Sequence, residues 1–512
     1  MNNLYGWAMS QPMPSGGFRF VPRNEYEQIN WLTQEEDQDI GYIVTCDVTY
    51  PPELHELHNE YPMMPEPRRI VLDMLSEKQL QLFREYNVPR SSMTYKLLPT
   101  FLPRYHYTMH FAMLRFVLEH GALLITIHSV IEFRQSRWLA PYITLNTRLR
   151  SVPNNSDFEK DFFKLMNNSV YGKTCENQKK RTDIKLSTKE KELQKWIAKP
   201  HCKRFKIFDV NLAAIELRKL HPILDKPCYV GFSVLEYSKL IMYRFHYDYF
   251  LAKYGAQRAH LCFTDTDSLL YHVETDNIYA DMYTDRVRFD FSDYARTSPY
   301  FEESNRKVIG KMKDEMNGKP IIEFVGLRAK MYSLLVLEPV SQTVIEKHRA
   351  KGIQRAASAE LRHAQYLAQL NIPSTHITTN RRIGAEAHQL YTLEMRKRGL
   401  CSFDDKRFLL ADGIHSLSYG HHDIPAREAQ RPALAAEQRG ELVLDAGMYI
   451  RRYRPRWLGR RKTEPPRGAD PRQAVIDACN VAESAAAAAH VGAEPRARGS
   501  APATAAAPDA WG

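Results

Sequence analysis

The sequence contains few cysteines, and their spacing excludes the common cysteine-based frameworks. Seven cysteines are scattered over 512 residues, and no two of them form a C-x-x-C pair. This spacing does not indicate a zinc site. The first residues carry neither the charged nor the apolar segment of a secretory signal. An odd number of cysteines without such a signal predicts reduced thiols in a nuclear or cytoplasmic protein.

The chain also lacks an apolar run long enough to cross a bilayer. The longest such stretch, residues 121–130, contains His128. It is shorter than the roughly 20 residues that a transmembrane helix needs. We therefore expect no membrane partner. Internal repeats are absent as well.

Acidic residues are outnumbered by basic ones. Lysine and arginine total 71 against 60 for aspartate and glutamate, and the net charge is +11. Such a balance suits a partner with a phosphate backbone, although charge alone does not establish one. Aromatic and basic residues interleave at 104–107, 243–247 and 451–454. These aromatic side chains either stack on bases or belong to the core beside basic residues that reach the surface.

Two aspartates separated by one residue stand between two β-prone runs. Asp265 and Asp267 lie between residues 260–263 and residues 269–273. A strand–turn–strand hairpin would aim both carboxylates at one face of a sheet. Two such acceptors repel each other unless a cation lies between them, and Mg²⁺ with oxygen ligands suits that place. Metal-held phosphate chemistry is one interpretation, and a polar turn without a ligand is the other.

The spacing of apolar residues predicts an amphipathic helix over residues 157–174. Ser156 and Glu159 match a capping box at its start. One face carries Phe158, Phe162, Leu165 and Met166, and the opposite face carries Lys160, Lys164, Asn167 and Tyr171. Two interpretations stay open. Either the apolar stripe packs on the core and the basic face is solvated, or the two lysines bind a polyanion such as a triphosphate, which offsets their mutual repulsion.

Two strings, in this order, resemble motifs B and C of family B DNA polymerases. Residues 164–172 fit K-x-x-x-N-S-x-Y-G, and residues 265–268 read D-T-D-S. The wider resemblance covers about residues 1–422. It is closest to the protein-primed branch and, within it, to the polymerases of Polinton or Maverick transposons. The further matching strings are residues 2–10, 41–62, 138–142, 229–233, 323–332 and 402–407.

The resemblance implies a metal and phosphate role for four residues. Asp267 is expected to be the main metal ligand and Asp265 the supporting carboxylate, with two Mg²⁺ ions between them and the substrate. Lys164, helped by Lys160, is expected to hold the triphosphate of an incoming dNTP.

Further matched residues are expected to line the nucleotide and the DNA. Asn168 and Tyr171 would line the pocket of the nascent base pair. Leu4 and Tyr5 resemble the end of motif A, and Tyr5 would exclude a ribose 2′-hydroxyl. The residues that resemble primer-contact and duplex-contact motifs are Lys330, Tyr332 and Lys351.

Motif A has the form D-x-x-x-L-Y, and its aspartate would stand directly before Met1. The resemblance therefore implies either an N-terminally truncated polymerase or a decayed copy of one. The first function is a DNA polymerase that adds dNTPs to a primer–template, for a mobile element or a virus-like genome. A terminal protein would be a further partner. The alternative is a catalytically dead nucleic-acid-binding remnant. A reverse transcriptase is disfavoured, because Thr266 separates aspartates that are adjacent in that class.

The resemblance implies an α+β right hand with an antiparallel palm sheet, helical fingers and a small thumb. The expected parts are palm start with partial motif A (1–34), insertion (35–104), fingers with a second short insertion (105–224), palm with the D-T-D-S hairpin (225–301), palm end and thumb (302–424) and tail (425–512). The tail is rich in Ala, Arg and Pro. We expect it to be disordered, because it cannot bury enough apolar surface to offset the entropy of ordering.

Overall fold

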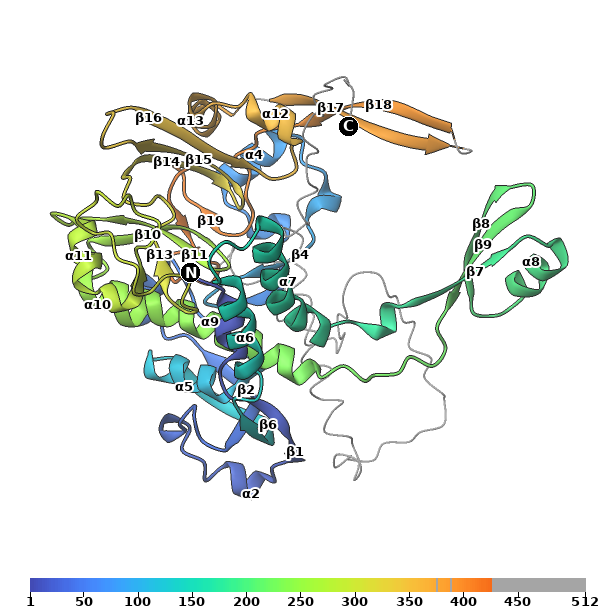
Figure 1. Cartoon of the computed structure of the whole chain (residues 1–512), viewed down its shortest axis with the longest axis horizontal. Helices are drawn as coiled ribbons and strands as arrows, with labels where there is room; N and C mark the ends of the chain where they lie inside the picture. Colours follow the sequence, from blue (N-terminus) through green and yellow to red (C-terminus); the bar gives the residue numbers. More distant parts are fainter. Residues whose placement is uncertain (374–375, 387–388, 426–512) are drawn as a thin grey trace, which may run out of the picture.

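The computed structural model describes residues 1–425 except 374–375 and 387–388 (Figure 1). The predicted tail from residue 426 onward lies outside the described residues. In the described part, helices are mixed with sheets that are antiparallel, apart from the short parallel pair of β12 (Phe289–Asp290) and β13 (Met312–Lys313). The expected mixture of helices and antiparallel sheets is therefore confirmed.

A four-stranded antiparallel sheet lies at the centre of the main core. Its strands, in spatial order, are β1 (Met13–Phe20), β6 (Leu123–Ser136), β2 (Ile40–Thr49) and β5 (Arg104–His110). Alternate residues of a strand point to the same face, and Val44, Cys46 and Val48 of β2 are all almost completely buried. This period of two explains why an alternating sequence forms a strand here.

Helix α9 (Cys228–Arg244) crosses the centre of the molecule and continues as the π-helical turn η6 (Phe245–Leu251) (Figure 1). It is buried on most sides, as expected of a helix that is apolar nearly all round. Helices α1 (Leu4–Met9), α5 (Phe111–Glu119) and α7 (Asp157–Thr174) contact it. A Cβ on Gly231 would lie 2.1 Å from Cys175 Sγ, so the glycine permits the close approach of the chain that leaves α7.

Helix α7 (Asp157–Thr174) begins with the Ser156–Glu159 capping box that the sequence predicts. Its apolar stripe, however, does not face the core, because Phe158, Phe162 and Leu165 are 59%, 44% and 62% exposed. The interpretation of a core-facing apolar stripe is therefore wrong. The helix packs against α1, α9 and α6 (Ala140–Arg150) through its other face, which contains the buried Asn167 and Tyr171.

Two parts of the chain project from the body (Figure 1). One is a three-stranded sheet, ordered β7-β9-β8, with a helix beside it, and the other is the hairpin of β17 and β18. The bounds are β7 (Thr182–Ser187), α8 (Glu190–Ile197), β8 (Cys202–Asp209), β9 (Leu212–Arg218), β17 (Ile377–Glu386) and β18 (Gln389–Arg398). The first projection falls between α7 and α9, where the sequence suggests a second insertion.

Residues 66–98 pack against residues 400–424, far away along the chain. They share a core that contains Leu82, Tyr86 and Tyr419. The Tyr86 hydroxyl lies 2.9 Å from the Ser402 hydroxyl. The elements of this part are β3 (Glu66–Arg69), α4 (Glu77–Glu85), β4 (Tyr95–Leu98), β19 (Phe408–Leu409) and β20 (Ser416–Leu417). This packing holds the end of the described chain against its first hundred residues.

The remaining elements include two hairpins that carry the candidate site. The strands are β10 (Ala259–Asp265), β11 (Ser268–Val273), β14 (Ile321–Arg328), β15 (Met331–Leu337) and β16 (Val344–Ala350). The helices are α2 (Arg23–Tyr26), α3 (His55–His58), α10 (Ala252–Tyr254), α11 (Ile278–Thr284), α12 (Arg355–Ala359) and α13 (His363–Asn371). The 3₁₀ turns are η1 (Trp31–Thr33), η2 (Pro52–Leu54), η3 (Leu72–Met74), η4 (Arg90–Ser92), η5 (Gln178–Lys180) and η7 (Arg286–Arg288). Among the described helices, none has the length and apolar character needed to cross a bilayer.

The second aromatic–basic cluster is mostly part of the core, whereas in the first only Arg104 is buried. Arg104, Tyr243 and Tyr247 are 1%, 3% and 6% exposed, whereas Tyr105 is 52% exposed. The core interpretation therefore holds for the buried rings, which have no surface left for stacking on bases. The third cluster, residues 451–454, lies outside the described residues.

Candidate functional site

The two aspartates lie at the tip of a hairpin, as the sequence predicts. Strands β10 and β11 pair antiparallel, with Asp265 opposite Ser268 and with Thr266 and Asp267 in the turn. The Asp267 N–H donates to the Asp265 carbonyl oxygen over 2.7 Å. We refer to residues 265–268 as the carboxylate hairpin. Asp267 belongs to the turn, so the strand alternation invoked from the sequence applies only to Asp265.

The turn is strained. Thr266 has a φ of 59°, in the left-handed region that β-branched residues rarely adopt. Such a conformation costs about 1–3 kcal/mol and persists only where the surroundings impose it. Lys330, in the turn between β14 and β15, has a φ of 60°. Lys330, in the turn of the β14–β15 hairpin, therefore has the same unusual backbone conformation as Thr266.

An ion pair joins the two turns. Lys330 Nζ lies 2.9 Å from Asp265 Oδ1, and both side chains are about one-third exposed. The ring of Tyr332 lies 4.8 Å from that of Phe263 on β10. Lys351 is tied to the same turn, because its N–H donates to the Lys330 carbonyl oxygen over 3.0 Å. The three residues that resemble DNA-contact motifs therefore share one sheet, and one of them contacts a carboxylate of the hairpin.

Tyr5 links the carboxylate hairpin to helix α7. Its ring stacks on that of Tyr171, with centroids 4.5 Å apart and planes 20° apart. Burial, and then the charges of Asp267 and Asp265, raise the pKa of Tyr5 to about 12. The Tyr5 hydroxyl is thus close enough to both carboxylates to sense their charge, and it stays protonated at neutral pH. Leu4, beside it, is buried in the core.

The first residues run directly past the hairpin. The α-amino group of Met1 donates to the Asp267 carbonyl oxygen over 2.8 Å. Burial lowers the pKa of this ammonium, and the Asp267 charge opposes that shift. Asn2 pairs with the backbone of Lys311 and donates from Nδ2 to Asp290 Oδ2 over 2.7 Å. The position that precedes residue 1 is therefore adjacent to the carboxylate hairpin.

Lys160 and Lys164 of α7 remain accessible to solvent, although they share a helix face with the buried Asn167 and Tyr171. Lys160 Nζ is 3.2 Å from Asp157 Oδ1, while Lys164 and Asn168 are exposed. In the described part of the chain, no hydrogen bond or ion pair connects Lys164 or Asn168 to the carboxylate hairpin. These two residues are thus on the same helix as Tyr171 but are not joined to the hairpin.

Sequence reasoning missed three basic residues near Lys160. Burial, and then the charges of Arg150, Arg306 and Lys160, lower the pKa of Lys307. Arg150 ends α6, whereas Arg306 and Lys307 lie far along the chain. The only sequence signal is an adjacent basic pair at 306–307, which is too common to single out. We refer to these four residues as the basic cluster.

The donor set of the hairpin fits a hard divalent ion. Carboxylate oxygens are the ligands that Mg²⁺ prefers. In this structure the Lys330 ammonium stands beside Asp265 as the neutralising cation. Asp267 is exposed on the turn, so its carboxylate is open to an ion from solvent.

Comparison with known proteins gives a distant likeness. No protein-family profile and no curated protein match the sequence. Among solved structures, the chain is similar to phi29 DNA polymerase in a ternary complex with primer–template DNA and incoming nucleotides, with 14% identity and a TM-score of 0.45. A post-translocation binary complex with primer–template DNA gives 12% and 0.45, and an orthorhombic crystal form gives 14% and 0.45. The first match covers 78% of this chain and 56% of the phi29 chain.

Proposed function

We propose that this chain is the right-hand core of a template-directed DNA polymerase of the protein-primed family B type. It would add dNTPs to a primer 3′ end by two-metal phosphoryl transfer. The observation that carries this proposal is the meeting of four segments that are distant in sequence. Tyr5, Tyr171, the carboxylate hairpin and Lys330 were each singled out by a different motif, and ring stacking, charge and an ion pair join them at one place.

The hairpin carboxylates supply the metal ligands in this proposal. Asp267 and Asp265 would hold two Mg²⁺ ions, which neutralise charge on the attacking and leaving oxygens when bound. Asp265 must first release Lys330, because one oxygen of this carboxylate is already paired with the ammonium. The freed Lys330 then has its charge available for a phosphate of the primer end.

The stacked tyrosines form the floor of the nucleotide pocket. Tyr5 stays neutral near pH 7, so its hydroxyl donates a hydrogen bond and does not repel a triphosphate. Stacking on the Tyr171 ring fixes the position of the Tyr5 ring. A rigid, half-buried ring at this place would collide with a 2′-hydroxyl and so select deoxynucleotides.

The basic residues are arranged to receive phosphate. The basic cluster brings like charges together, and Asp157 beside Lys160 and Glu303 beside Arg306 balance part of that charge. A polyanion would neutralise the remainder. Lys164 and Asn168 extend this surface along α7. We assign the triphosphate to Lys160 and Lys164. The strings shared with Polinton and Maverick polymerases extend the proposal to replication of a mobile element or a virus-like genome, with a terminal-protein hydroxyl as a further primer.

The second candidate function is a nucleic-acid-binding protein without catalysis. One observation favours it: the Lys330 ammonium is already paired with Asp265. If this ion pair persists, the ions lose one of the two hairpin carboxylates as a ligand, and metal placement provides most of the catalysis. The basic cluster would still bind DNA.

Single-nucleotide extension of a labelled primer–template with Mg²⁺ tests the proposal. The chain is compared with a version in which Asp-Ala replaces Met1 behind an initiating Met, so that an aspartate stands next to the hairpin. We expect the version with the added aspartate to extend the primer. If neither version extends although both bind the duplex, the second candidate function gains.

Matched variants assign the activity to the hairpin. In the version with the added aspartate, Asp267→Asn should abolish extension. Asp276→Asn, which changes an exposed aspartate just beyond β11, should leave it intact. Normal extension by Asp267→Asn would show that the metal site has been assigned to the wrong residues.

A further inference from the structure

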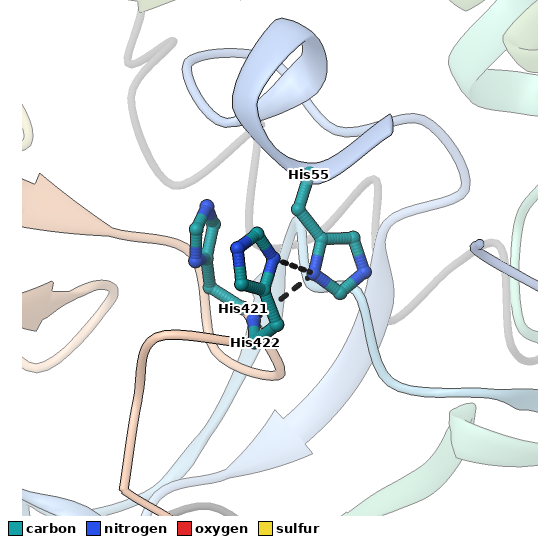
Figure 2. Close-up of side chains that lie close together, drawn as sticks. All are labelled: His55, His421 and His422. Carbon is teal, nitrogen blue, oxygen red and sulfur yellow. Dashed lines mark hydrogen bonds between the residues drawn. The ribbon is translucent and has the colours of Figure 1, made fainter. Parts of the chain in front are cut away.

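A second group of ligand-type side chains lies away from the carboxylate hairpin. His55 and Glu56 begin helix α3, and His421, His422 and Asp423 lie near the end of the described chain. Figure 2 shows the three imidazoles gathered at one place. We refer to these five residues as the histidine junction. They are separated by more than 360 positions in sequence, so no spacing rule would connect them.

Four of these side chains point ligand atoms at a common space. His421 Nε2 lies 3.4 Å from Glu56 Oε1, and His422 Nε2 lies 3.9 Å from the same oxygen. His422 Nε2 is also 3.5 Å from Asp423 Oδ1. The four ligand atoms all lie within 4.8 Å of one another. Ligands at 2.0–2.1 Å from a tetrahedral ion are roughly 3.3 Å apart. The three printed separations therefore need to shorten by less than about 1 Å, and no pair of the set by more than about 1.5 Å.

His421 supplies a second, independent indication of a ligand. Its ring is 2% exposed, and in the described part of the chain its Nε2 makes no hydrogen bond. Buried polar atoms are nearly always satisfied, and an exception is explained when an ion or another ligand occupies the space in front of the atom. Glu56 Oε1 faces this nitrogen at 3.4 Å without the geometry of a hydrogen bond.

His55 fixes the tautomer of His422. The backbone N–H of His422 donates to His55 Nδ1 over 3.0 Å, so that nitrogen is an acceptor. His422 Nδ1 lies 3.3 Å from the same acceptor and must therefore carry the proton of this contact (Figure 2). The lone pair of neutral His422 is then on Nε2, facing two carboxylates. A lone pair and two anions repel one another unless a cation lies between them.

The chemistry of the four ligands selects the ion. Two imidazole nitrogens and two carboxylate oxygens suit Zn²⁺, whereas Mg²⁺ prefers oxygen ligands alone. The negative charges of the Glu56 and Asp423 carboxylates balance the double positive charge of the ion. One contact must change on binding: His421 Nδ1 accepts the Asp423 N–H over 3.2 Å and would instead carry a proton directed at Asp423 Oδ2, 3.6 Å away.

The surroundings hold the two halves of the site together. The half-buried Arg407 donates to the Asn59 carbonyl oxygen over 2.8 Å and to Asn59 Oδ1 over 3.1 Å. It thereby ties the residue after α3 to the segment that leads to His421. Glu60, the next residue, accepts the Leu261 N–H on β10 over 2.6 Å. The ligands therefore lie on a preformed joint that also reaches the strand carrying the carboxylate hairpin.

We propose that Glu56, His421, His422 and Asp423 form a structural Zn²⁺ site, with His55 orienting His422. The ion would fasten the end of the described chain to helix α3. This inference does not depend on the proposed polymerase function. The expectation of no zinc site rested on cysteine spacing, which carries no information about sites made of histidine and carboxylate.

Zn²⁺ titration of the full chain, stripped of metal by a chelator, tests the proposal. Excess Mg²⁺ is kept present to occupy oxygen-only sites. We expect one equivalent of tightly bound Zn²⁺ and a rise in Tm of several degrees. Co²⁺ in place of Zn²⁺ should give the visible absorption bands of a four-coordinate ion with nitrogen and oxygen ligands. If the chain binds no Zn²⁺ more tightly than the Mg²⁺-saturated background, or if Co²⁺ stays six-coordinate, the proposal fails.

Variants separate this site from other histidines of the chain. Glu56→Gln with Asp423→Asn removes two ligands whose side chains are 73% and 60% exposed, and it should weaken Zn²⁺ binding at least 100-fold. The control is His415→Gln with Asp412→Asn, an exposed histidine–aspartate pair on the same segment, which should bind as the parent does. Equal binding by the two double variants would overturn the proposal. Should the first variant not fold, His422→Gln, with a partly exposed side chain, replaces it with the same expectation.

Discussion

At the carboxylate hairpin, two aspartates separated by one residue lie on a strained turn at the surface, and a lysine ammonium neutralises one of them. At the histidine junction, the ligands come from the two ends of the described chain, and the imidazoles of His55 and His421 are 5% and 2% exposed. One region offers oxygen ligands with ready access from solvent. The other offers mixed ligands where two distant segments meet, with His421 buried and the other three ligands exposed.

Under the two proposals, this difference separates two kinds of metal use. An accessible set of carboxylates exchanges its cation easily, as a site must when its ions arrive with substrate and leave with product. Ligands that close a long loop stabilise the folded chain instead, because binding occurs only after the distant segments have met. We therefore expect changes at the hairpin to affect turnover and changes at the junction to affect stability.

The largest expected effect is on turnover at the hairpin. Asp267→Asn, in the version with an added aspartate before residue 1, should reduce extension by at least about 10³-fold, because charge stabilisation by the metal site is lost. Thermal unfolding should be unchanged within a degree or two, since Asp267 is exposed. A large decrease in Tm with little decrease in the rate of extension would show that the hairpin contributes to stability and not to turnover.

The next effect concerns helix α7, whose Tyr171 stacks on Tyr5. Tyr171→Ala removes a buried ring that stacks on Tyr5 and should destabilise the chain by about 3–5 kcal/mol. Phe162→Ala, on the exposed apolar stripe of the same helix, should cost less than about 0.5 kcal/mol. Urea unfolding of both variants measures the difference. Equal costs would mean that the apolar stripe is covered in the folded chain.

Adding back either Zn²⁺ or Mg²⁺ should distinguish the histidine junction from the carboxylate hairpin, because each metal should restore a different property. After chelation, Zn²⁺ at 100 times its dissociation constant should raise the free energy of unfolding by about 2.7 kcal/mol through the junction. Mg²⁺ should restore extension without a comparable rise in stability. The measurement is paired thermal melts and extension assays with each metal. A stabilisation by Mg²⁺ as large as that by Zn²⁺ would remove the distinction.

The smallest expected effect is the pH dependence of stability that comes from His246, which contacts strand β11. Burial lowers the pKa of His246 to about 4, and its Nδ1 lies 2.9 Å from the hydroxyl of Tyr271 on β11. The folded pKa is below the unfolded value of about 6.5, so the unfolded chain binds more protons between these pH values. Stability from this group is complete above about pH 6.5. It decreases as the pH falls toward 4, by up to about 1.4 kcal/mol per pH unit.

A double variant checks this pH dependence. His246→Phe with Tyr271→Phe replaces both partners of the contact by apolar rings, so no buried polar atom of the pair is left unsatisfied. Between pH 7 and pH 4, the urea midpoint of this variant should fall less steeply than that of the parent. The difference should correspond to the uptake of about one proton fewer on unfolding. An identical slope would show that His246 titrates in the folded chain as it does in the unfolded one.

Features that depend on neighbouring residues could be predicted from the sequence. Helix α7 has the predicted bounds and capping box, because the Ser156–Glu159 hydrogen bonds need only a few consecutive residues. The hairpin around Asp265 and Asp267 forms because two β-prone runs flank a two-residue turn. Motif resemblance also named Tyr5, Tyr171 and Lys330, although no periodicity places them beside that hairpin.

The buried face of α7 could not be predicted from its own residues. Its apolar stripe is the stronger pattern, yet the helix buries Asn167 and Tyr171, because α1, α6 and α9 are the surfaces available to it. Hydrophobic periodicity shows that a helix has two faces. It does not show which face the rest of the chain will cover.

Local sequence was sufficient for the turn with its two aspartates and for the start of the lysine-bearing helix, since both depend on hydrogen bonds between residues close along the chain. Only the folded chain decided that Lys330 neutralises Asp265, that Tyr5 stacks on Tyr171 and that His55 meets His422. These contacts join side chains far apart in sequence. Their existence depends on how sheets and helices pack, because electrostatic attraction, ring stacking and metal coordination act over a few ångströms of space and not over a number of residues.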